Sequence, residues 1–434
     1  MLFADLHLHS KYSRAVSPSM DLEHLAAGAQ KKGLGLLGTG DFTHPLWFAE
    51  LKSKLEEADA GSGIYRLKGG NPAVRFVLQA EISTIISDGT KVRKVHHIVF
   101  APSLESAASL NSLLAKKGNL SADGRPTFGS TSPAALVEIC RQADSRIEVV
   151  PAHAWTPYFS VFGSISGYDS IEEAYADQAR YIKAYETGMS SNPAMNWRVS
   201  RLDKYAQISN SDSHSPYPYR IGRECNAFHF GAREPTYEGL FDAMYSHDGS
   251  KFAFTIEVDP NYGKYHYDGH RNCKFSCPPG QTRRLAGMCP VCGRPLTIGV
   301  LYRVEALADR PEGVKPVGAI PFKTLLPLQE LVAAAIGSPL ASKKSFEQTE
   351  RLTARFGTEF AVLLDATHES LQSAAGPELA AVIIANREGK LTVRPGFDGE
   401  YGVLELGGGT PKEGLPGKRS TGSAVAAQKG LSDF

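Results

Sequence analysis

Long apolar runs and an excess of charge of either sign are both missing from this sequence. No stretch approaches the roughly 18 consecutive apolar residues of a membrane-spanning helix, and the start, MLFADLHLHS, lacks the basic and apolar regions of a signal peptide. Lysine and arginine number 47 against 46 aspartate and glutamate, a net charge of +1. This balance argues against a protein that coats nucleic acid with its whole surface, although a local basic patch stays compatible with it. We expect a cytoplasmic protein that does not enter a membrane.

Cysteine is also scarce, and its placement is uneven. Of the six cysteines in 434 residues, Cys140 and Cys225 stand alone, whereas the others fall close together: Cys273, Cys277, Cys289 and Cys292. In a chain without a signal peptide such a cluster indicates a metal site before a disulfide framework. The remaining composition, 42% hydrophobic and 21% charged residues, is typical of a globular protein. The length predicts two or three domains.

Residues 1–258 alternate short apolar runs with longer amphipathic stretches. Strands are expected at 2–9, 33–40, 75–82, 96–102, 147–153, 184–187 and 206–212. Helices are expected between most of them, at 21–32, 45–58, 104–116, 132–143 and 170–179. Repeated βα units of this kind predict an α/β fold, either a parallel barrel or a doubly wound sheet.

The rest of the chain divides by composition. Residues 259–310 hold the cysteine cluster with many glycines and prolines, and we expect a small zinc-binding, ribbon-like domain there. Residues 311–406 contain apolar-patterned helical segments and a short hairpin with Asp398-Gly399 at its turn. Residues 407–434 are rich in Gly, Ser, Pro and Lys, which predicts a flexible tail.

Polar side chains cluster where the predicted strands end. They are His7 and His9; Asp41 and His44; Glu81; His96 and His97; His153; and Asp212 and His214. One such group is weak support for a site, but the carboxyl ends of the strands in a βα array share one mouth, where such enzymes hold their active sites. Imidazoles and carboxylates that converge there would disturb one another's pKa values. Metal ions resolve this conflict because they neutralise carboxylates and favour unprotonated imidazoles.

The chemistry of these side chains predicts the metals and the reaction. A mixture of imidazole nitrogen and carboxylate oxygen suits Zn²⁺, Mn²⁺ or Fe, and suits Mg²⁺ less well. Because the candidates exceed what one tetrahedral ion can use, we expect two or three divalent ions, Zn, Mn or Mg. Neighbouring ions hydrolyse phosphoesters by generating hydroxide and by clamping the attacking and leaving oxygens. The sequence therefore predicts metal-assisted phosphoester hydrolysis.

At these residues the sequence resembles the polymerase-and-histidinol-phosphatase (PHP) domain, whose motifs match in order HLHS, GDFTHP, AEIS, HHIV, PAHAW and SDSH. The resemblance implies a distorted seven-stranded (β/α) barrel with up to three metal ions. The ligands that it implies are His7, His9, Asp41, His44, Glu81, His97, His153, Asp212 and His214. His97 is preferred to His96 because it directly precedes the apolar run IVF, as in the family pattern. Glu81 is expected to bridge two ions, and the expected catalytic residues are Asp212, Glu81 and His153.

The cysteine cluster has the spacing H-x3-H-x2-C-x3-C-x11-C-x2-C, from His266 to Cys292. Its CPVCG knuckle is a strong zinc-ribbon half-site. In the other half Cys273 pairs either with Cys277, at a less usual spacing, or with His270, at the better knuckle spacing. We favour a structural zinc held by His270, Cys273, Cys289 and Cys292, with Cys277 as the alternative fourth ligand. Such a ribbon most often stabilises a small region and takes no part in catalysis.

Basic residues gather around the cysteine cluster with few acidic neighbours: Arg271, Lys274, Arg283, Arg284, Arg294 and Arg303. Taken alone, these residues are equally consistent with charges scattered over the protein surface. Beside a phosphodiesterase-like site they favour contacts with a nucleic-acid backbone. Arg220 and Arg223, which follow the Asp212 and His214 motif, are also placed to meet a phosphate.

Over about residues 1–405 the sequence resembles the endonuclease Q family of DNA repair enzymes. The resemblance rests on PAHAWTPYFSVFGS, ETGMSSNP, NSDSHSPYPYRIGRE, KYHYDGHRNC, CPVCGRPLTIGVLYRVEALADRP, AIPFKTLLPLQELV and PGFDGEYG. It implies cleavage of DNA on the 5′ side of a deaminated base (uracil, hypoxanthine or xanthine) or an abasic site. Cys277 is an addition to the family pattern, which leaves the fourth zinc ligand open.

Cleavage beside a damaged base requires that base to leave the helix stack and enter a pocket. Aromatic residues follow the expected ligand His153 directly: Trp155, Tyr158, Phe159 and Phe162. For any one of these residues, packing within a loop is a slightly better explanation than contact with a base. We expect at least one of them to line a base pocket.

Two other functions fit parts of the sequence. A small-molecule phosphatase of the histidinol-phosphatase type would use the same metal site, but it would not need the basic zinc ribbon or the helical region. A catalytically silent nucleic-acid-binding protein built on the same barrel would be expected to lack ligands, whereas every ligand position is filled. A lesion-directed DNA endonuclease is the preferred prediction.

Overall fold

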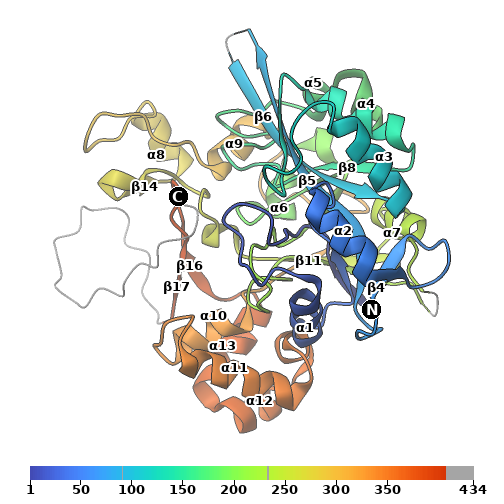
Figure 1. Ribbon diagram of the computed structural model, residues 1–434. Coiled ribbons are helices and arrows are strands. Elements are labelled where there is room, and N and C mark those ends of the chain that lie inside the picture. The colour runs from blue at the N-terminus through green and yellow to red at the C-terminus, as the bar shows by residue number, and fades with distance from the viewer. Residues whose placement is uncertain (90, 232–233, 407–434) are drawn as a thin grey trace.

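A computed structural model describes residues 1–89, 91–231 and 234–406 (Figure 1). The predicted strands are present as β1 (Leu2–Asp5), β2 (Leu36–Gly38), β5 (Arg75–Asp88), β6 (Lys91–Ala101), β8 (Glu148–Pro151), β9 (Ala184–Glu186) and β10 (Ala206–Ile208). Further strands of the same half are β3 (Leu55–Glu57), β4 (Ile64–Leu67), β7 (Thr127–Gly129), β11 (Cys225–Phe228) and β12 (Phe252–Glu257). The predicted α/β class is confirmed, and the predicted tail at 407–434 lies outside the described residues.

Hydrogen bonds connect the predicted strands in a circuit. β1 pairs with β2, β2 with β5, β5 with β6, and β6 with β8. Beyond β8, the Ala154 amide donates to the carbonyl of Glu186 at the end of β9, and β9 pairs with β10. Leu8 and Ser213 then form a bridge between the segments that follow β1 and β10. The segments that follow β1, β8, β9 and β10 therefore lie around one mouth.

Strand β6 runs antiparallel to its neighbours, which corrects the expectation of a parallel array. It forms a long antiparallel hairpin with β5, in which Asp88 pairs with Lys91, so the chain reverses within two residues. A reversal this tight needs no crossover helix, because antiparallel strands can be joined by a short turn. The hairpin extends from the top of the molecule in Figure 1.

The helices of the first half are α1 (Leu22–Lys32), α2 (Pro45–Lys54), α3 (Leu104–Leu114), α4 (Pro133–Ala143), α5 (Ile171–Tyr175), α6 (Pro193–Asn196) and α7 (Tyr237–Tyr245). The starts of α1, α3 and α4 follow from side-chain capping, since Asp21, Ser103 and Ser132 each accept a hydrogen bond from an amide of the first turn. α2 ends earlier than predicted, because the following residues form β3 and pair with β4. The apolar core includes Trp47, Phe76 and Leu110.

The second half begins with the antiparallel pair β13 (Asp268–His270) and β14 (Phe275–Cys277), followed by α8 (Pro279–Arg284) and α9 (Val300–Leu307). Next come β15 (Phe322–Thr324), the helices α10 (Leu328–Ala335), α11 (Lys343–Phe356), α12 (His368–Ala375) and α13 (Pro377–Arg387), and the hairpin of β16 (Thr392–Arg394) and β17 (Val403–Glu405). β15 pairs with β12, so the main sheet extends into the region predicted as a separate domain. The boundaries at 258 and 310 stay predictions.

The helices α10 to α13 lie together beside α1 in Figure 1. They share an apolar cluster of their own that includes Leu331, Leu352 and Ile383. Across the described ranges, no helix combines the length and the apolar character of a membrane span.

Candidate metal centre

The pairing of β5 with β6 decides which side chains face the mouth. Glu81 and Ser83 lie on one face of β5, because side chains alternate along a strand. Directly opposite Ser83 is His96, whereas His97 is opposite Ile82. His96 therefore shares the face of Glu81, and His97 points to the other side.

His97 was the predicted ligand, and the structure corrects this choice to His96. The Nδ1 atom of His97 lies 2.8 Å from the Tyr175 hydroxyl, and its Nε2 lies 2.9 Å from the Thr84 hydroxyl, so both nitrogens are used in the core. The Nδ1 atom of His96 lies 2.7 Å from Glu81 Oε1. Burial lowers the pKa of His97 to about 3, consistent with a neutral ring held by hydrogen bonds.

Two groups of potential ligands meet at Glu81. The first contains His7, His9, Glu81 and Asp212, and the second contains Glu81, His96 and His153; within each group the ligand atoms lie within 4.8 Å of one another. Glu81 Oε1 is 3.2 Å from His153 Nε2, while Glu81 Oε2 is 3.3 Å from His9 Nε2. The two oxygens of one carboxylate thus face two different groups, which is the geometry of a bridging ligand.

The open side of the centre lies at Asp212. Its side chain is 34% exposed and that of His214 is 36% exposed, whereas Glu81 and His7 are fully buried. Asp212 Oδ1 lies 3.1 Å from His9 Nε2 and 3.8 Å from His7 Nε2. The centre is therefore accessible to solvent at Asp212 and His214.

The other predicted ligands lie beside these groups but do not belong to them. Asp41 Oδ1 is 3.1 Å from His9 Nδ1, and its Oδ2 accepts hydrogen bonds from Ser10 and Ser13. The His214 ring centroid is 4.7 Å from that of His9. His44 stacks on Tyr12 at 4.6 Å, and its buried Nδ1 has no hydrogen-bond partner among the described residues. As placed, Asp41 orients His9.

Glu186, at the end of β9, is a functional residue that the sequence did not reveal. Its carboxylate lies 3.1 Å from His7 Nδ1, accepts a 2.7 Å hydrogen bond from the His153 amide, and accepts another from Asn210. A carboxylate behind a ligating imidazole fixes its tautomer and its orientation. The position at a strand end was the available signal, but the strand is short and contains no histidine.

Arg125 is a second residue missed by the sequence. Its Nη1 lies 3.0 Å from Glu81 Oε2. It comes from the segment before β7, away from the strand ends that the prediction used.

The charges of the centre suit a divalent cation. Burial alone would raise the pKa of Glu81, but His96, Arg125 and His153 hold it well below its usual value. Burial would lower the pKa of His7, but Glu186, Glu81 and Asp212 outweigh it and raise this pKa well above the usual value. The Glu81 carboxylate is thus ionised, and the carboxylates around His7 favour a positive charge, from a proton or a metal ion, at its ring. His7 Nε2 is buried, lacks a hydrogen-bond partner among the described residues and lies 3.8 Å from both Glu81 and Asp212, so these donors fit metal binding.

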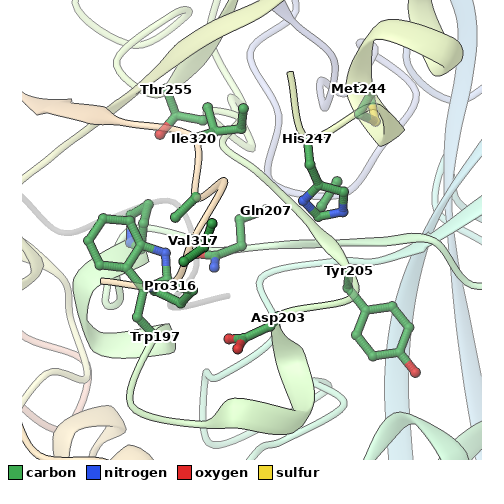
Figure 2. Close-up of a pocket in the computed structure, with 13 residues that line it drawn as sticks. Trp197, Asp203, Tyr205, Gln207, Met244, His247, Thr255, Pro316, Val317 and Ile320 are labelled. Carbon is green, nitrogen blue, oxygen red and sulfur yellow. The ribbon is translucent and has the colours of Figure 1, made fainter. Parts of the chain in front are cut away.

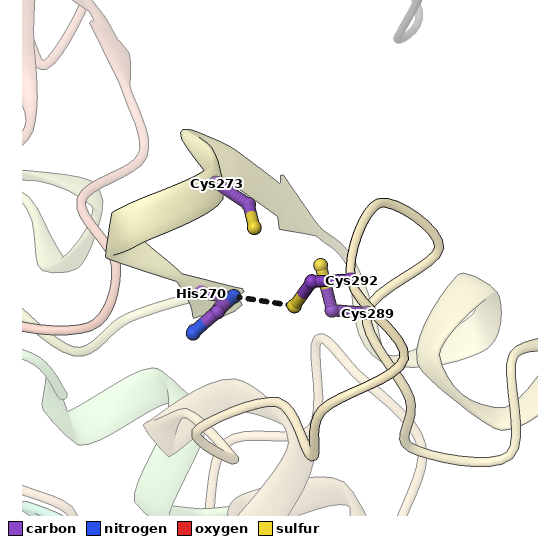
Figure 3. A group of neighbouring side chains, drawn as sticks. All are labelled: His270, Cys273, Cys289 and Cys292. Carbon is purple, nitrogen blue, oxygen red and sulfur yellow. Dashed lines mark hydrogen bonds between the residues drawn. The ribbon is translucent and has the colours of Figure 1, made fainter.

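A second potential metal site joins β13 to the CPVCG knuckle (Figure 3). It consists of His270, Cys273, Cys289 and Cys292, whose ligand atoms lie within 4.8 Å of one another. His270 Nδ1 is 3.3 Å from Cys292 Sγ. Cys277 is buried and contacts the Thr282 hydroxyl instead, at 3.3 Å. The structure thus brings together the favoured set and keeps Cys277 out of it.

The aromatic residues after His153 separate into two kinds. Trp155 and Phe162 are buried and pack together with ring centroids 4.7 Å apart, so they are not the members of this set that are open to a base. Trp155 also donates its indole N–H to Asn196. Tyr158, in contrast, is 44% exposed, and the half-buried Phe159 lies 4.7 Å from His96. Only these last two remain candidates for contact with a base.

The predicted DNA-contacting cations are placed unequally. Arg271, Lys274, Arg283 and Arg284 are exposed around the cysteine cluster, and Arg283 pairs with Glu305 at 2.7 Å. Arg303 is used inside the protein, since its guanidinium donates to the carbonyls of Phe162 and Tyr168. Arg223 is buried and donates to the Ser211 carbonyl at 2.8 Å, one residue before Asp212.

A pocket at the other end of β10 does not belong to this centre (Figure 2). Its lining includes Trp197, Tyr205, His247 and Pro316. Asp203, the carboxylate in this lining, is held by both terminal nitrogens of Arg310 at 2.9 and 2.6 Å. The pocket therefore lacks the convergent ligands that the metal centre has.

Comparisons with known proteins show what this chain is similar to. The MJ0043 C-terminal domain family matches residues 327–390. The chain is 31% identical to the uncharacterized protein MJ0043 of Methanocaldococcus jannaschii over 257 residues, which are 58% of this chain but only 31% of that protein's length. It is 30% identical to the uncharacterized protein YqxK of Bacillus subtilis over 418 residues, which cover 93% of this chain and 99% of YqxK.

Solved structures extend the comparison to the fold. The crystal structure of the lesion-specific endonuclease PfuEndoQ from Pyrococcus furiosus is similar at a TM-score of 0.81 and 32% identity, covering 93% of this chain and 95% of that one. A complex of endonuclease Q with a 27-mer duplex substrate carrying an abasic lesion is similar at a TM-score of 0.82 and 32% identity, covering 94% and 96%. The chain therefore belongs to the endonuclease Q family of DNA-cleaving enzymes.

Proposed function

We propose that this protein is a lesion-specific DNA endonuclease that hydrolyses the phosphodiester on the 5′ side of a deaminated base or an abasic site. The observation that carries the proposal is Glu81, which is buried between two groups of ligands that open to solvent at Asp212. The abasic duplex bound by a solved relative supports DNA with a lesion as the substrate.

The barrel is of the PHP type, and its mouth holds two or three divalent ions, Zn, Mn or Mg. His7, His9, Glu81 and Asp212 hold one ion, and Glu81, His96 and His153 hold a second. Asp41, His44 and His214 complete a third position. Bound there, the ions supply Lewis acidity for the attack of water on phosphorus and neutralise the charge that develops on the phosphodiester.

The protein side chains perform the remaining work of the site. Glu81 connects the two ligand groups, because one carboxylate oxygen faces His153 and the other faces His9. Glu186 fixes the orientation of the His7 ring through Nδ1. Asp212 lies at the open side, where it meets both ligands and substrate. The ligand side chains are already buried in a fixed arrangement. Little reorganisation of the protein is therefore needed during hydrolysis.

The ribbon region, residues 259–310, holds a structural zinc through His270, Cys273, Cys289 and Cys292. The exposed cations around it contact the DNA backbone: Arg271, Lys274, Arg283 and Arg284. Tyr158 and Phe159, next to the second ligand group, contact the extruded base. The division into regions at 1–258, 259–310 and 311–406 is part of the same proposal.

The deciding experiment uses duplexes that carry a single uracil, hypoxanthine, xanthine or abasic site, incubated with Mg²⁺, Mn²⁺ or Zn²⁺ beside a phosphomonoester. We expect a nick 5′ to the lesion and none in the undamaged duplex. Release of phosphate from the monoester without nicking of DNA would instead identify a small-molecule phosphatase.

Asp212→Asn tests the role of the open side. The amide keeps the shape of the carboxylate but loses the negative charge that faces His7 and His9, so nicking should fall by at least about 100-fold. Circular dichroism and thermal unfolding should match the unaltered protein. Retained nicking would contradict a metal-ligating Asp212.

A further inference from the structure

A group of cations surrounds the phenol of Tyr401, outside the ligand groups. Tyr401 belongs to the segment between β16 and β17, and it is 41% exposed. The Lys264 ammonium lies 4.8 Å from the centre of its ring, and Tyr262 packs against the same ring at 5.8 Å. Burial alone would raise the pKa of the Tyr401 hydroxyl, but the positive charges of Arg223, Lys264 and Arg220 lower it.

Backbone hydrogen bonds fix this arrangement. The Gly399 amide donates to the Lys264 carbonyl at 3.0 Å, and the Gly402 amide donates to the Tyr262 carbonyl at 3.0 Å. A side chain at position 402 would clash with the backbone, since its Cβ would lie 2.1 Å from the Asn261 carbonyl oxygen. Tyr401 is therefore held over residues 262–264 by its own main chain.

The cations of this group lack carboxylate partners. Within the described ranges, Arg220, Arg223 and Lys264 form no ion pair with an acidic side chain within 4.0 Å. The carboxyl groups that act electrostatically on these arginines include Glu224 and Asp212, on Arg223, and Glu330, on Arg220. Burial raises the pKa of Glu224 and Glu330, which favours their neutral forms and leaves the cations less compensated. Converging cations of this kind attract an anion.

The cation group adjoins the metal centre. Arg223 donates from Nε and Nη2 to the Ser211 carbonyl, at 3.2 and 2.8 Å, and Asp212 is the next residue. Arg220 precedes Arg223 by three residues in the sequence, and its guanidinium lies 5.2 Å from the centre of the Tyr219 ring. An anion bound by these residues would thus lie close to the open side of the centre.

We propose that Arg220, Arg223, Lys264 and Tyr401 form a phosphate subsite that holds a DNA backbone phosphate neighbouring the one that is cleaved. This inference rests on the proposed function and names a further part of its substrate site. A DNA phosphate is favoured over free phosphate because a duplex anchored at the metal centre delivers its phosphates to the neighbouring cations, whereas a free anion reaches them without this anchoring. The Tyr401 hydroxyl donates a hydrogen bond to the phosphate oxygen, and the cations supply charge.

The test measures DNA affinity in a background that does not cleave. A fluorescently labelled duplex with one abasic site is titrated with the full-length Asp212→Asn protein at several KCl concentrations. Lys264→Ala and Arg220→Ala, each added to this background, should weaken binding about tenfold and lower the slope of log Kd against log [KCl] by about 1 each. Tyr401→Phe keeps the ring, so it should weaken binding with little change in slope.

Lys204→Ala is the matched control. Lys204 also lies over a tyrosine ring, that of Tyr205 at 5.0 Å, but at the start of β10, the end away from Asp212. It should leave affinity and slope unchanged. Unchanged affinity and slope in Lys264→Ala and Arg220→Ala, with unaltered thermal unfolding, would overturn the subsite.

Orthophosphate separates the two sources of phosphate. At constant ionic strength it should displace DNA no better than chloride; stronger displacement that disappears in Lys264→Ala would assign the subsite to free phosphate and overturn the proposal. Failure of the proposed function is seen separately, as absence of nicking by the unaltered protein. DNA binding is measured without cleavage, so the two outcomes are independent.

Discussion

Glu186 is a single carboxylate that serves both ligand groups. It lies 3.1 Å from His7 Nδ1 and accepts the His153 amide at 2.7 Å. Glu186→Gln keeps the size of the side chain but removes the charge behind His7, so metal affinity should fall about 10- to 100-fold. Competition with a chelator followed by elemental analysis measures this affinity. Glu148→Gln, at the start of β8, should not change it.

His96 and His97 give a sharper test, because they are neighbours with different surroundings. His96→Ala removes a member of the second ligand group, so the bound metal per protein should decrease. His97→Ala removes the buried contacts with Thr84 and Tyr175, so the free energy of unfolding should fall by about 1–3 kcal/mol. The metal content should stay the same. Loss of metal in His97→Ala but not in His96→Ala would restore the original assignment.

The same pair shows where sequence reasoning stops at the scale of single residues. Adjacent residues of a strand face opposite sides, so one of the two histidines had to face Glu81. Which one does so depends on the register between β5 and β6, and the sequence does not encode that register in any short motif. Ligands that follow different strands, such as His7 and Asp212, were predictable because strand ends converge in such folds.

At the scale of elements, the segment after His153 depends on α9. Arg303 of α9 donates to the carbonyl of Phe162 at 2.8 Å and to that of Tyr168 at 2.9 Å. The same segment contacts both histidines of the second ligand group: Ser160 Oγ lies 3.0 Å from His153 Nδ1, and the Phe159 carbonyl accepts the His96 amide. Helix α9 thus holds the segment that positions His96 and His153.

Arg303→Ala should therefore loosen this segment. Removing these charged hydrogen bonds should reduce the free energy of unfolding by about 2–3 kcal/mol, and residues 156–168 should exchange amide hydrogens faster in deuterated water. Arg283→Ala is the control, because Arg283 forms an exposed pair with Glu305 on the same region. Unchanged exchange in Arg303→Ala would show that α9 does not restrain the segment.

The sequence predicted the elements better than their directions and contacts. Short apolar runs located β1, β5 and β8, because each of these strands contributes buried apolar residues to the core. The antiparallel course of β6 was missed because a tight turn replaces the expected crossover. Arg303 was grouped with the surface cations, because a sequence does not distinguish an arginine that binds carbonyls from one that faces solvent.

At the scale of the whole molecule, helix α1 and the C-terminal helical region are joined by a buried ion pair. Lys32 of α1 and Glu359, which follows α11, are 1% and 0% exposed, with Nζ and Oε1 2.7 Å apart. Glu359 also accepts the Leu328 amide at the start of α10. The neighbouring pair of Lys31 and Glu350 joins the same helices, but it is 50% and 55% exposed. Nothing in the sequence separates the two lysines, and only packing determines which one is buried.

Substitution of the lysine in each pair should change the free energy of unfolding by very different amounts. Lys32→Met leaves the Glu359 charge buried without its partner, so the free energy of unfolding should fall by about 3–5 kcal/mol. Lys31→Met should change it by less than about 1 kcal/mol, because water screens an exposed pair. Adding Glu359→Leu to Lys32→Met removes the stranded charge and should recover most of the loss. Urea unfolding, followed by tryptophan fluorescence and circular dichroism, measures each value. If Lys32→Met unfolds like Lys31→Met, the buried pair does not hold the two regions together.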